Sequence, residues 1–165
     1  MLASNLLIER IRIIIEKVGV KNPPIPLNKV ASLFSIEIVP YPHFSNNISG
    51  TIVNRGGHVF IGINPSHSKT RQRFTIAHEL GHFLMGHDEA EIVEDKFDKS
   101  SDKEKEANQF ASELLMPKDF ILKDITEKNG RINIKDLAKR YEVSEQAMSI
   151  RLLETGLINR LQIIN

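Results

Sequence analysis

The chain contains no cysteine among its 165 residues. This absence excludes disulfide bonds, iron–sulfur clusters and zinc sites built on thiolates. Any metal ion must therefore be held by histidine and carboxylate side chains. Three of the six histidines fall within one short stretch, RFTIAHELGHFLMGH, which runs from Arg73 to His87.

The sequence also lacks an excess of charge of one sign and a long hydrophobic run. Its 22 lysines and arginines nearly balance 21 aspartates and glutamates, so a strong attraction of the whole molecule to nucleic acid or anionic lipid is not expected. Acidic residues concentrate in 88–106, which is typical of a solvated loop and helix start. The apolar N-terminal segment is interrupted by charged residues well short of a membrane-spanning length, and nothing resembles a secretion signal. We therefore expect a cytoplasmic globular protein with no membrane partner.

The pattern of apolar residues predicts both helices and strands. The segment 49–64 is typical of a β-hairpin, with a tight turn at Asn54–Gly57 where the glycines permit positive φ. The helix that carries the histidine-rich stretch is expected to end near Gly86. The other segments expected before the C-terminal part are helices over 4–19, Leu27–Phe34 and 101–116 (ending at Pro117) and a strand within 35–42.

The motif HELGH places His78 and His82 one helical turn apart, so both imidazoles can reach one point. Glu79 lies beside them, and Gly81 leaves room for another backbone to approach closely. The flanking residues are apolar on nearly every side, which predicts a buried helix. Burying each polar group without a partner costs roughly 1–3 kcal/mol, and a metal ion satisfies all three together. We therefore interpret HELGH as a metal site with Glu79 as general base, rather than as a pair of core histidines bonded to backbone.

Such a site needs a third protein ligand. The extended motif HExxHxxGxxH does not provide it, because Met85 occupies the glycine position and Asp88 the last histidine position. His87 comes one residue too early. We predict that His87 is a surface residue or a hydrogen-bonding partner of a ligand.

The third ligand is expected from EKEANQFASELLMP (104–117) instead. On a helical wheel, Glu104 lies about 50° from the centre of the apolar stripe and Glu106 about 110° from it. Glu104 therefore points more nearly inward, and Asn108 one turn later can hydrogen-bond a ligating histidine. Two alternatives stay open. Ser101 and Glu104 also match a capping box, and Glu106 is the reserve ligand.

The two segments RFTIAHELGHFLMGH and EKEANQFASELLMP together resemble the ImmA/IrrE family of metallopeptidase-like proteins, which are bacterial and phage regulators. The resemblance is strong over 50–117 and loose elsewhere. It implies an α+β fold with a thermolysin-like zincin core, in which a small, mostly antiparallel sheet packs on the HExxH helix. It also implies a zinc site formed by His78, His82 and Glu104, with Glu79 as base and Asn108 at the matching position one turn after Glu104.

The same resemblance implies a function. Members of the family cleave helix-turn-helix repressors, or promote their cleavage, and so switch on mobile-element or stress genes. We expect a zinc-dependent endopeptidase that acts on such a repressor or on an antitoxin. Histidine and carboxylate ligands suit zinc best, although Mn²⁺ or Fe²⁺ can load the same set. The alternative is a non-catalytic, metal-containing regulator that binds protein or DNA.

The C-terminal part, from INIKDLAKRYEV onward, has the pattern of a helix-turn-helix. A DNA-binding unit should carry basic residues on its second helix, but that helix has Glu145, Arg151 and Glu154. A scaffold or substrate-docking role is therefore favoured over DNA binding. We predict a metallopeptidase domain over 1–117 and a helical subdomain over 118–165.

Substrate contacts are less defined. The strand His58–Asn64 precedes the metal-site helix and could hold an extended substrate by strand addition, although an ordinary sheet strand fits equally well. His58, His67 and Tyr41 are unranked candidates for stabilising an oxyanion.

Overall fold

The structure is a computed structural model that describes residues 2–87 and 101–158. Much of the acidic segment 88–106, including Asp88, and the terminal apolar stretch from residue 159 lie outside the described residues. In chain order the elements are α1 Leu2–Val18, α2 Leu27–Ser32, β1 Ile36–Pro40, β2 Gly50–Arg55, β3 His58–Ile63, α3 Lys69–Leu84, α4 Asp102–Leu115, α5 Lys118–Glu127, α6 Ile134–Tyr141 and α7 Glu145–Glu154. The expected helices, hairpin and strand are confirmed to within a few residues.

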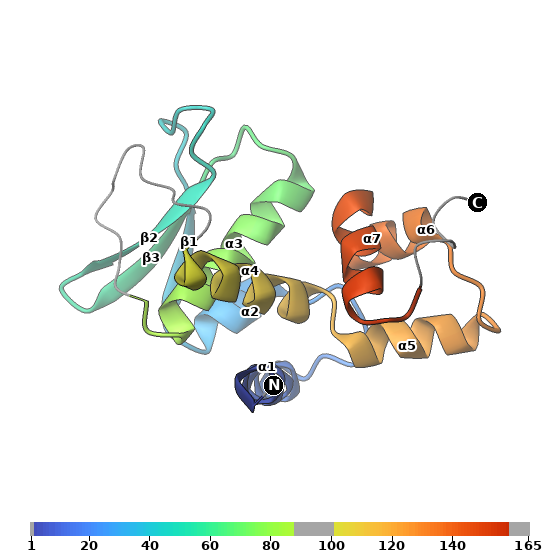
Figure 1. The fold of residues 1–165 in the computed structure, drawn as a ribbon. Coiled ribbons are helices and arrows are strands. Elements are labelled where there is room, and N and C mark those ends of the chain that lie inside the picture. The colour runs from blue at the N-terminus through green and yellow to red at the C-terminus, as the bar shows by residue number, and fades with distance from the viewer. Residues whose placement is uncertain (1, 88–100, 159–165) are drawn as a thin grey trace.

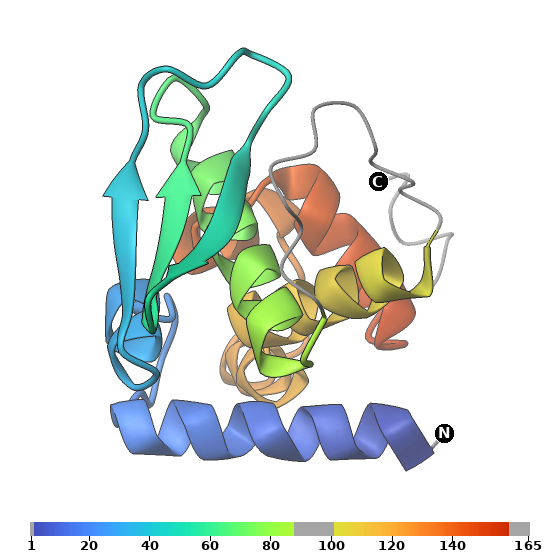
Figure 2. The ribbon, with the colours of Figure 1, turned by 90° about the vertical axis from the view of Figure 1, so that its left-hand side faces the viewer.

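The elements are arranged in layers. Figure 1 shows the sheet on one side, α3 and α4 in the middle, and α5, α6 and α7 on the other side. Figure 2 shows α1 crossing below the sheet and the central helices. This α+β arrangement, with a small sheet against the HELGH helix, confirms the expected fold class.

The three strands form one sheet in the order β1-β3-β2. β2 and β3 are an antiparallel hairpin, closed by Gly56 and Gly57 at φ values of 60° and 86°. β1 pairs with β3 in parallel, so the sheet is mixed rather than mostly antiparallel. The chain leaves β1 at one edge of the sheet and enters β2 at the other edge, so β3 lies in the centre. That strand buries Val59, Ile61 and Ile63.

The helix α3, which carries HELGH, lies close against the hairpin. A Cβ atom added at Gly50, the first residue of β2, would lie 2.5 Å from Thr75 Cγ2 and 2.7 Å from the carbonyl oxygen of Gly62. A larger residue at position 50 would therefore push the strand away from α3. The glycine sets the distance between the edge of the sheet and the helix.

The C-terminal helices share one hydrophobic core with the rest of the chain. α6 and α7 are joined through Glu142, which adopts a left-handed conformation (φ 54°). The side chains of Tyr141 in α6 and Met148 in α7 are fully buried in this core. Two ion pairs add to this packing: Arg73 of α3 with Glu142, and Arg151 of α7 with a carboxylate of α4. The division at residue 117 stays a prediction.

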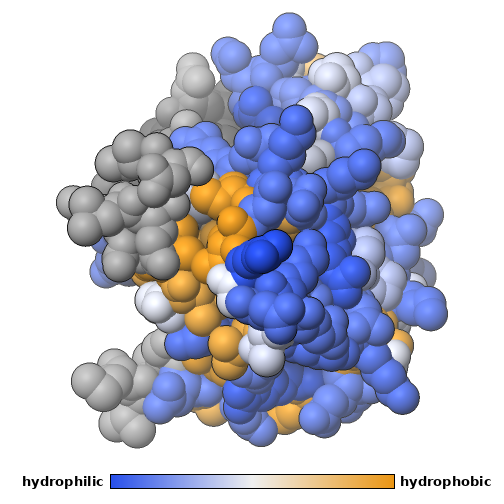
Figure 3. Space-filling view, turned by 90° about the vertical axis from the view of Figure 1, so that its right-hand side faces the viewer, coloured by the Kyte–Doolittle hydropathy of each residue, from blue (hydrophilic) through white to orange (hydrophobic). Residues whose placement is uncertain are grey.

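The face formed over the C-terminal helices is mostly hydrophilic, with a smaller apolar area within it (Figure 3). Leu122 of α5 and Ile150 of α7 are two of the exposed apolar side chains. Among the described residues, no helix has the length and apolar character needed to cross a membrane.

Candidate metal centre

The helix α3, which carries HELGH, is capped by Ser68, whose side chain accepts a hydrogen bond from the backbone N–H of Arg71. α3 crosses α4 at Gly81. A Cβ atom there would lie 3.2 Å from Ala107 Cα and 3.1 Å from Phe110 Cβ. The backbone of α4 thus approaches Gly81 closely, as expected. This contact brings α4 next to the histidines of α3.

The crossing brings His78 and His82 of α3 together with Glu104 of α4. The Nε2 atoms of the two histidines are 3.0 Å apart. Glu104 Oε2 lies 3.3 Å from His78 Nε2, and Glu104 Oε1 lies 3.0 Å from His82 Nε2. All three side chains are largely buried, with 13–18% of each exposed. One ligand atom from each residue lies within 4.8 Å of the others, so the group could hold a metal ion.

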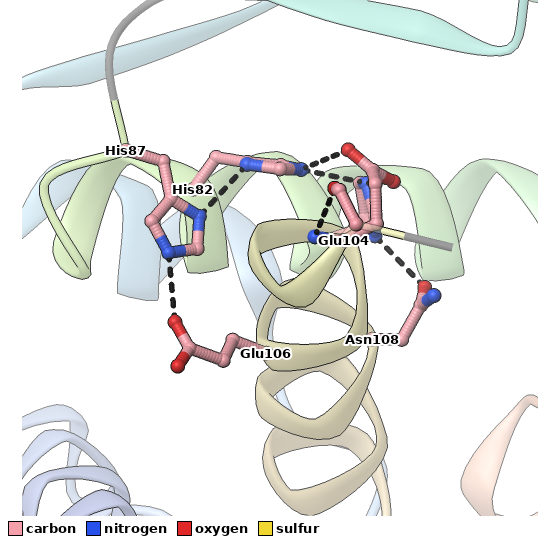
Figure 4. Close-up of polar contacts among 7 residues, drawn as sticks. His82, His87, Glu104, Glu106 and Asn108 are labelled. Atoms are coloured by element: carbon pink, nitrogen blue, oxygen red, sulfur yellow. Dashed lines mark hydrogen bonds and ion pairs between the residues drawn. The ribbon is translucent and has the colours of Figure 1, made fainter. Parts of the chain in front are cut away.

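Outer hydrogen bonds fix which ring nitrogen of each histidine faces the cluster (Figure 4). Asn108 Oδ1 lies 3.0 Å from His78 Nδ1 and can only accept, so Nδ1 donates and Nε2 keeps its lone pair. Glu106 lies 3.0 Å from His87 Nε2, which donates to it. His87 Nδ1 then accepts from His82 Nδ1 at 3.0 Å, so His82 Nε2 also keeps its lone pair.

Three electron-pair donors therefore converge with no N–H between them. Two Nε2 lone pairs and a carboxylate at 3.0–3.3 Å repel one another unless a cation lies between them. Nitrogen and oxygen ligands of a tetrahedral zinc ion, about 2.0–2.1 Å from the metal, lie about 3.3 Å from one another. Both the chemistry of the donors and their spacing fit zinc.

The start of α4 distinguishes the alternatives for Glu104. Ser101 Oγ accepts a hydrogen bond from the backbone N–H of Glu104 at 3.2 Å, as a helix cap does. The Glu104 carboxylate, however, is directed to the histidines rather than back to the helix start. Glu106 points away from the cluster and contacts His87. Glu104, and not Glu106, is therefore the carboxylate that lies with His78 and His82 in the group that could hold a metal ion.

His87 is a hydrogen-bonding partner of the cluster and not a surface residue. Its side chain is only 7% exposed. Gly86, in the left-handed conformation (φ 67°), turns the chain back so that His87 N–H donates to the carbonyl oxygen of His82. The glycine that ends the helix thus places this ring over the metal-site histidine.

Burial also sets the protonation states of the site. It raises the pKa of Glu79 to about 7, with a further contribution from Glu104 and an opposing hydrogen bond from the backbone of Ile52. Burial lowers the pKa of His82 to about 4, helped by neighbouring positive charge, and lowers that of His78. Both imidazoles are therefore neutral at neutral pH, as metal binding requires.

Two adjoining hollows of about 280 and 180 Å³ open onto the cluster. Gly50, His78, Glu79 and Glu104 line both of them. One hollow extends along β2 to Ile52, and the other extends toward Ser49, Phe74 and Arg71. Arg71 was not among the residues predicted for the site, although it lies seven residues before His78 and so shares its helix face. A larger hollow of about 710 Å³, between α1, α4 and α7, touches this site through Asn108.

The suggestion that the strand 58–64 holds the substrate is wrong. β3 is the central strand, paired with β1 on one side and β2 on the other, so it has no free edge. The candidates for oxyanion stabilisation do not line the two hollows either. His67 Nε2 contacts the carbonyl oxygen of Asn46, while His58 and Tyr41 are exposed.

The comparisons with known proteins agree with this arrangement. A solved structure described as a Mycobacterium tuberculosis transcriptional regulator matches with a TM-score of 0.66 over 90% of this chain, at 15% sequence identity. The match covers 46% of that chain, so the present chain spans about half of its length. No curated protein sequence is significantly similar. The model of the peptidase family described as the IrrE N-terminal-like domain matches residues 33–153, which include every residue of the cluster, and the chain belongs to that family.

Proposed function

We propose that the chain is a zinc-dependent endopeptidase that cleaves a regulatory protein, specifically a helix-turn-helix repressor or an antitoxin. The observation that carries the proposal is the position of Glu79. Its carboxylate is largely buried, lies next to the three converging donors and lines both hollows. A site that only stored metal needs His78, His82 and Glu104 but has no use for this fourth group. Membership of the IrrE-like family and the fold shared with a transcriptional regulator support a regulatory target.

Zinc at this site would supply a Lewis acid that polarises a peptide carbonyl and acidifies water. The remaining chemistry belongs to the protein. Burial raises the pKa of Glu79 in the metal-free chain, and from its place beside the cluster the carboxylate would accept a proton from the attacking water and return it to the leaving amine. The backbone N–H of Ile52 holds the carboxylate in place. Asn108 and His87 keep the two histidine rings oriented.

The free edge of β2 is the surface that an extended substrate fits. β2 pairs only with β3 among the described residues, and its other edge lines the hollow beside Glu79. The two-residue turn pairs Arg55 with His58, so alternate residues Ile52 and Gly50 direct their backbone groups away from β3. The N–H of Ile52 already donates to Glu79, which leaves the carbonyl of Ile52 and the backbone groups of Gly50 for a peptide. A peptide bound there by strand addition would pass the metal cluster.

DNA binding is the second candidate function, because the similar solved structure is a transcriptional regulator. The surface of α7 does not favour it. The only basic residue of this helix, Arg151, is buried against Glu113, and the exposed positions include Glu145 and Ile150. A salt-sensitive gel shift by the full chain at neutral pH would contradict a scaffold role for the C-terminal helices.

The proposal is tested by Glu79→Gln. A helix-turn-helix repressor encoded beside this protein is co-expressed with the parent or the variant, and cleavage is followed by mass spectrometry of the intact repressor. The parent should cleave in a chelator-sensitive manner, and the variant should not, while its zinc content stays near that of the parent. Cleavage by the variant would show that Glu79 is not the base. A repressor substrate would also place the activity in the cytoplasm.

A further inference from the structure

Arg71 lies at the end of the hollow that leads away from the metal cluster along α3. Its Nε and Nη2 atoms both donate to Ser49 Oγ, at 3.1 and 2.9 Å. In the part of the chain that the structure describes, no carboxylate pairs with Arg71, whereas Arg73 two residues later is paired with Glu142. A neutral hydroxyl is thus the only side-chain partner of this charge within those residues.

Arg71 is exposed to solvent, and this contact orients its guanidinium. The backbone of Arg71 is fixed as well, because its N–H donates to Ser68 Oγ and its carbonyl oxygen accepts from Thr75 Oγ1 at 3.0 Å. Two of the five N–H donors of the side chain are used by Ser49, which leaves three for a ligand. A preorganised fork with free donors suits a carboxylate group.

The distance between the Arg71 guanidinium and the metal cluster determines which substrate residue the guanidinium can contact. Seven helical residues separate Arg71 from His78, a rise of about 10 Å along the axis. An extended peptide advances about 3.3 Å per residue, so this rise corresponds to about three residues of substrate, and the long arginine side chain can also reach the position before. Ser49 directly precedes Gly50, the first residue of β2, so Arg71 lies at the beginning of that strand.

A peptide antiparallel to β2 has its C-terminal half at the beginning of the strand, and antiparallel pairing is the more stable arrangement. We propose that Arg71 and Ser49 form a subsite that binds the carboxylate of an aspartate or glutamate two or three residues after the scissile bond. The subsite rests on the proposed endopeptidase function and adds to it a preference for acidic sequence. Arg71 is a specificity residue here, because it contacts substrate away from the reacting atoms.

Metal-chelating peptides test the subsite without cleavage. The probes are peptide hydroxamates in which the hydroxamate takes the place of the scissile carbonyl and three residues follow it, with either Asp or Asn at the second or the third of these. Dissociation constants for the zinc-loaded chain are measured by calorimetry at low and physiological salt. One Asp probe should bind about tenfold more tightly than its Asn counterpart, less so at higher salt.

The variants decide whether Arg71 causes this difference. The Asp-over-Asn preference should vanish in Arg71→Ala, reverse in Arg71→Glu and persist in Arg55→Ala, a matched control at the opposite end of β2. Equal affinities in the parent, or a preference that survives in Arg71→Ala, overturn the subsite.

The same probes separate this inference from the proposed function. The Asn probes report only whether the cluster holds a chelatable metal, and repressor cleavage reports the activity. Cleavage of the repressor without an acidic preference overturns the subsite alone. An acidic preference in a chain that cleaves no repressor supports the subsite as a binding site and overturns the activity. Failure of every probe to bind overturns both.

Discussion

The ion pair between Arg151 of α7 and Glu113 of α4 joins the C-terminal helices to a helix of the metal centre. The two side chains are only 7% and 11% exposed. Arg151 Nε also donates to the carbonyl oxygen of Met116 at 2.9 Å. Replacing Arg151 by methionine keeps an apolar side chain of similar length but leaves the Glu113 carboxylate buried without a counter-charge. We expect the free energy of unfolding to fall by about 3–5 kcal/mol.

Urea unfolding followed by circular dichroism measures this loss. With a slope of about 2 kcal/mol per molar urea for a chain of this size, the midpoint should fall by roughly 1.5–2.5 M. The same curves test the predicted boundary between 1–117 and 118–165. A single transition in the parent indicates one cooperative unit, whereas two transitions indicate that the helical subdomain unfolds separately.

The chain offers a matched control in the pair between Arg12 of α1 and Asp119 of α5, whose side chains are 53% and 63% exposed. Because that pair is solvated, Arg12→Met should cost no more than about 1 kcal/mol. The double variant Glu113→Leu/Arg151→Met should recover much of the loss, since no uncompensated charge remains. A loss below about 1 kcal/mol for Arg151→Met, or a double variant as unstable as the sum of its single variants, would refute the reasoning.

Three further predictions concern the metal centre. Gly81→Ala puts a Cβ atom 3.2 Å from Ala107 Cα, and the overpacking of about 1–3 kcal/mol should outweigh the gain in helix propensity. We therefore expect a lower zinc affinity, measured by competition with a chromophoric chelator. An unchanged affinity would contradict this prediction. Glu104→Ala should reduce zinc bound per chain far more than Glu106→Ala, and the reverse result would move the third ligand. In the metal-free chain, burial raises the pKa of Glu79 from 4.5 to about 7, so its ionisation opposes folding as the pH rises through this range. Glu79→Gln should therefore add up to ~3 kcal/mol to the free energy of unfolding at pH 8 and little at pH 4.5, and an equal gain at both would contradict the assigned burial effect.

Much of the metal centre can be predicted from the sequence, because the positions of its residues depend on the helical repeat and on single side chains. The helical repeat alone puts His78 and His82 on one face, and the missing side chain of Gly81 marks the crossing of α3 and α4. The apolar stripe of α4 directs Glu104 inward for the same reason. The capping contact of Ser101 does form, but a backbone N–H satisfies it, so the carboxylate of Glu104 is free to turn to the histidines.

The features that local sequence does not determine depend on long-range pairing. Alternation of apolar residues predicts that 58–63 is a strand, but it contains no information on which neighbours the strand takes, so the central place of β3 and the parallel partner β1 were not predicted. For His87 the sequence left two outcomes open, a surface residue or a hydrogen-bonding partner of a ligand. A left-handed glycine at position 86 is compatible with both, and the packed structure selects the second by turning the chain back over the preceding turn.

The precision of the metal centre depends on the angle between two rigid helices, because α3 provides two donors and α4 provides the third. The C-terminal helices are attached to both. Arg73 of α3 lies 3.2 Å from Glu142 at the turn between α6 and α7, and Arg151 of α7 is buried against Glu113 of α4. Loosening either attachment removes support from the crossing, so stability and zinc affinity should fall together. Arg151→Met should therefore weaken zinc binding as well as folding, and Arg12→Met, whose pair lies outside the crossing, should change neither by more than a small amount.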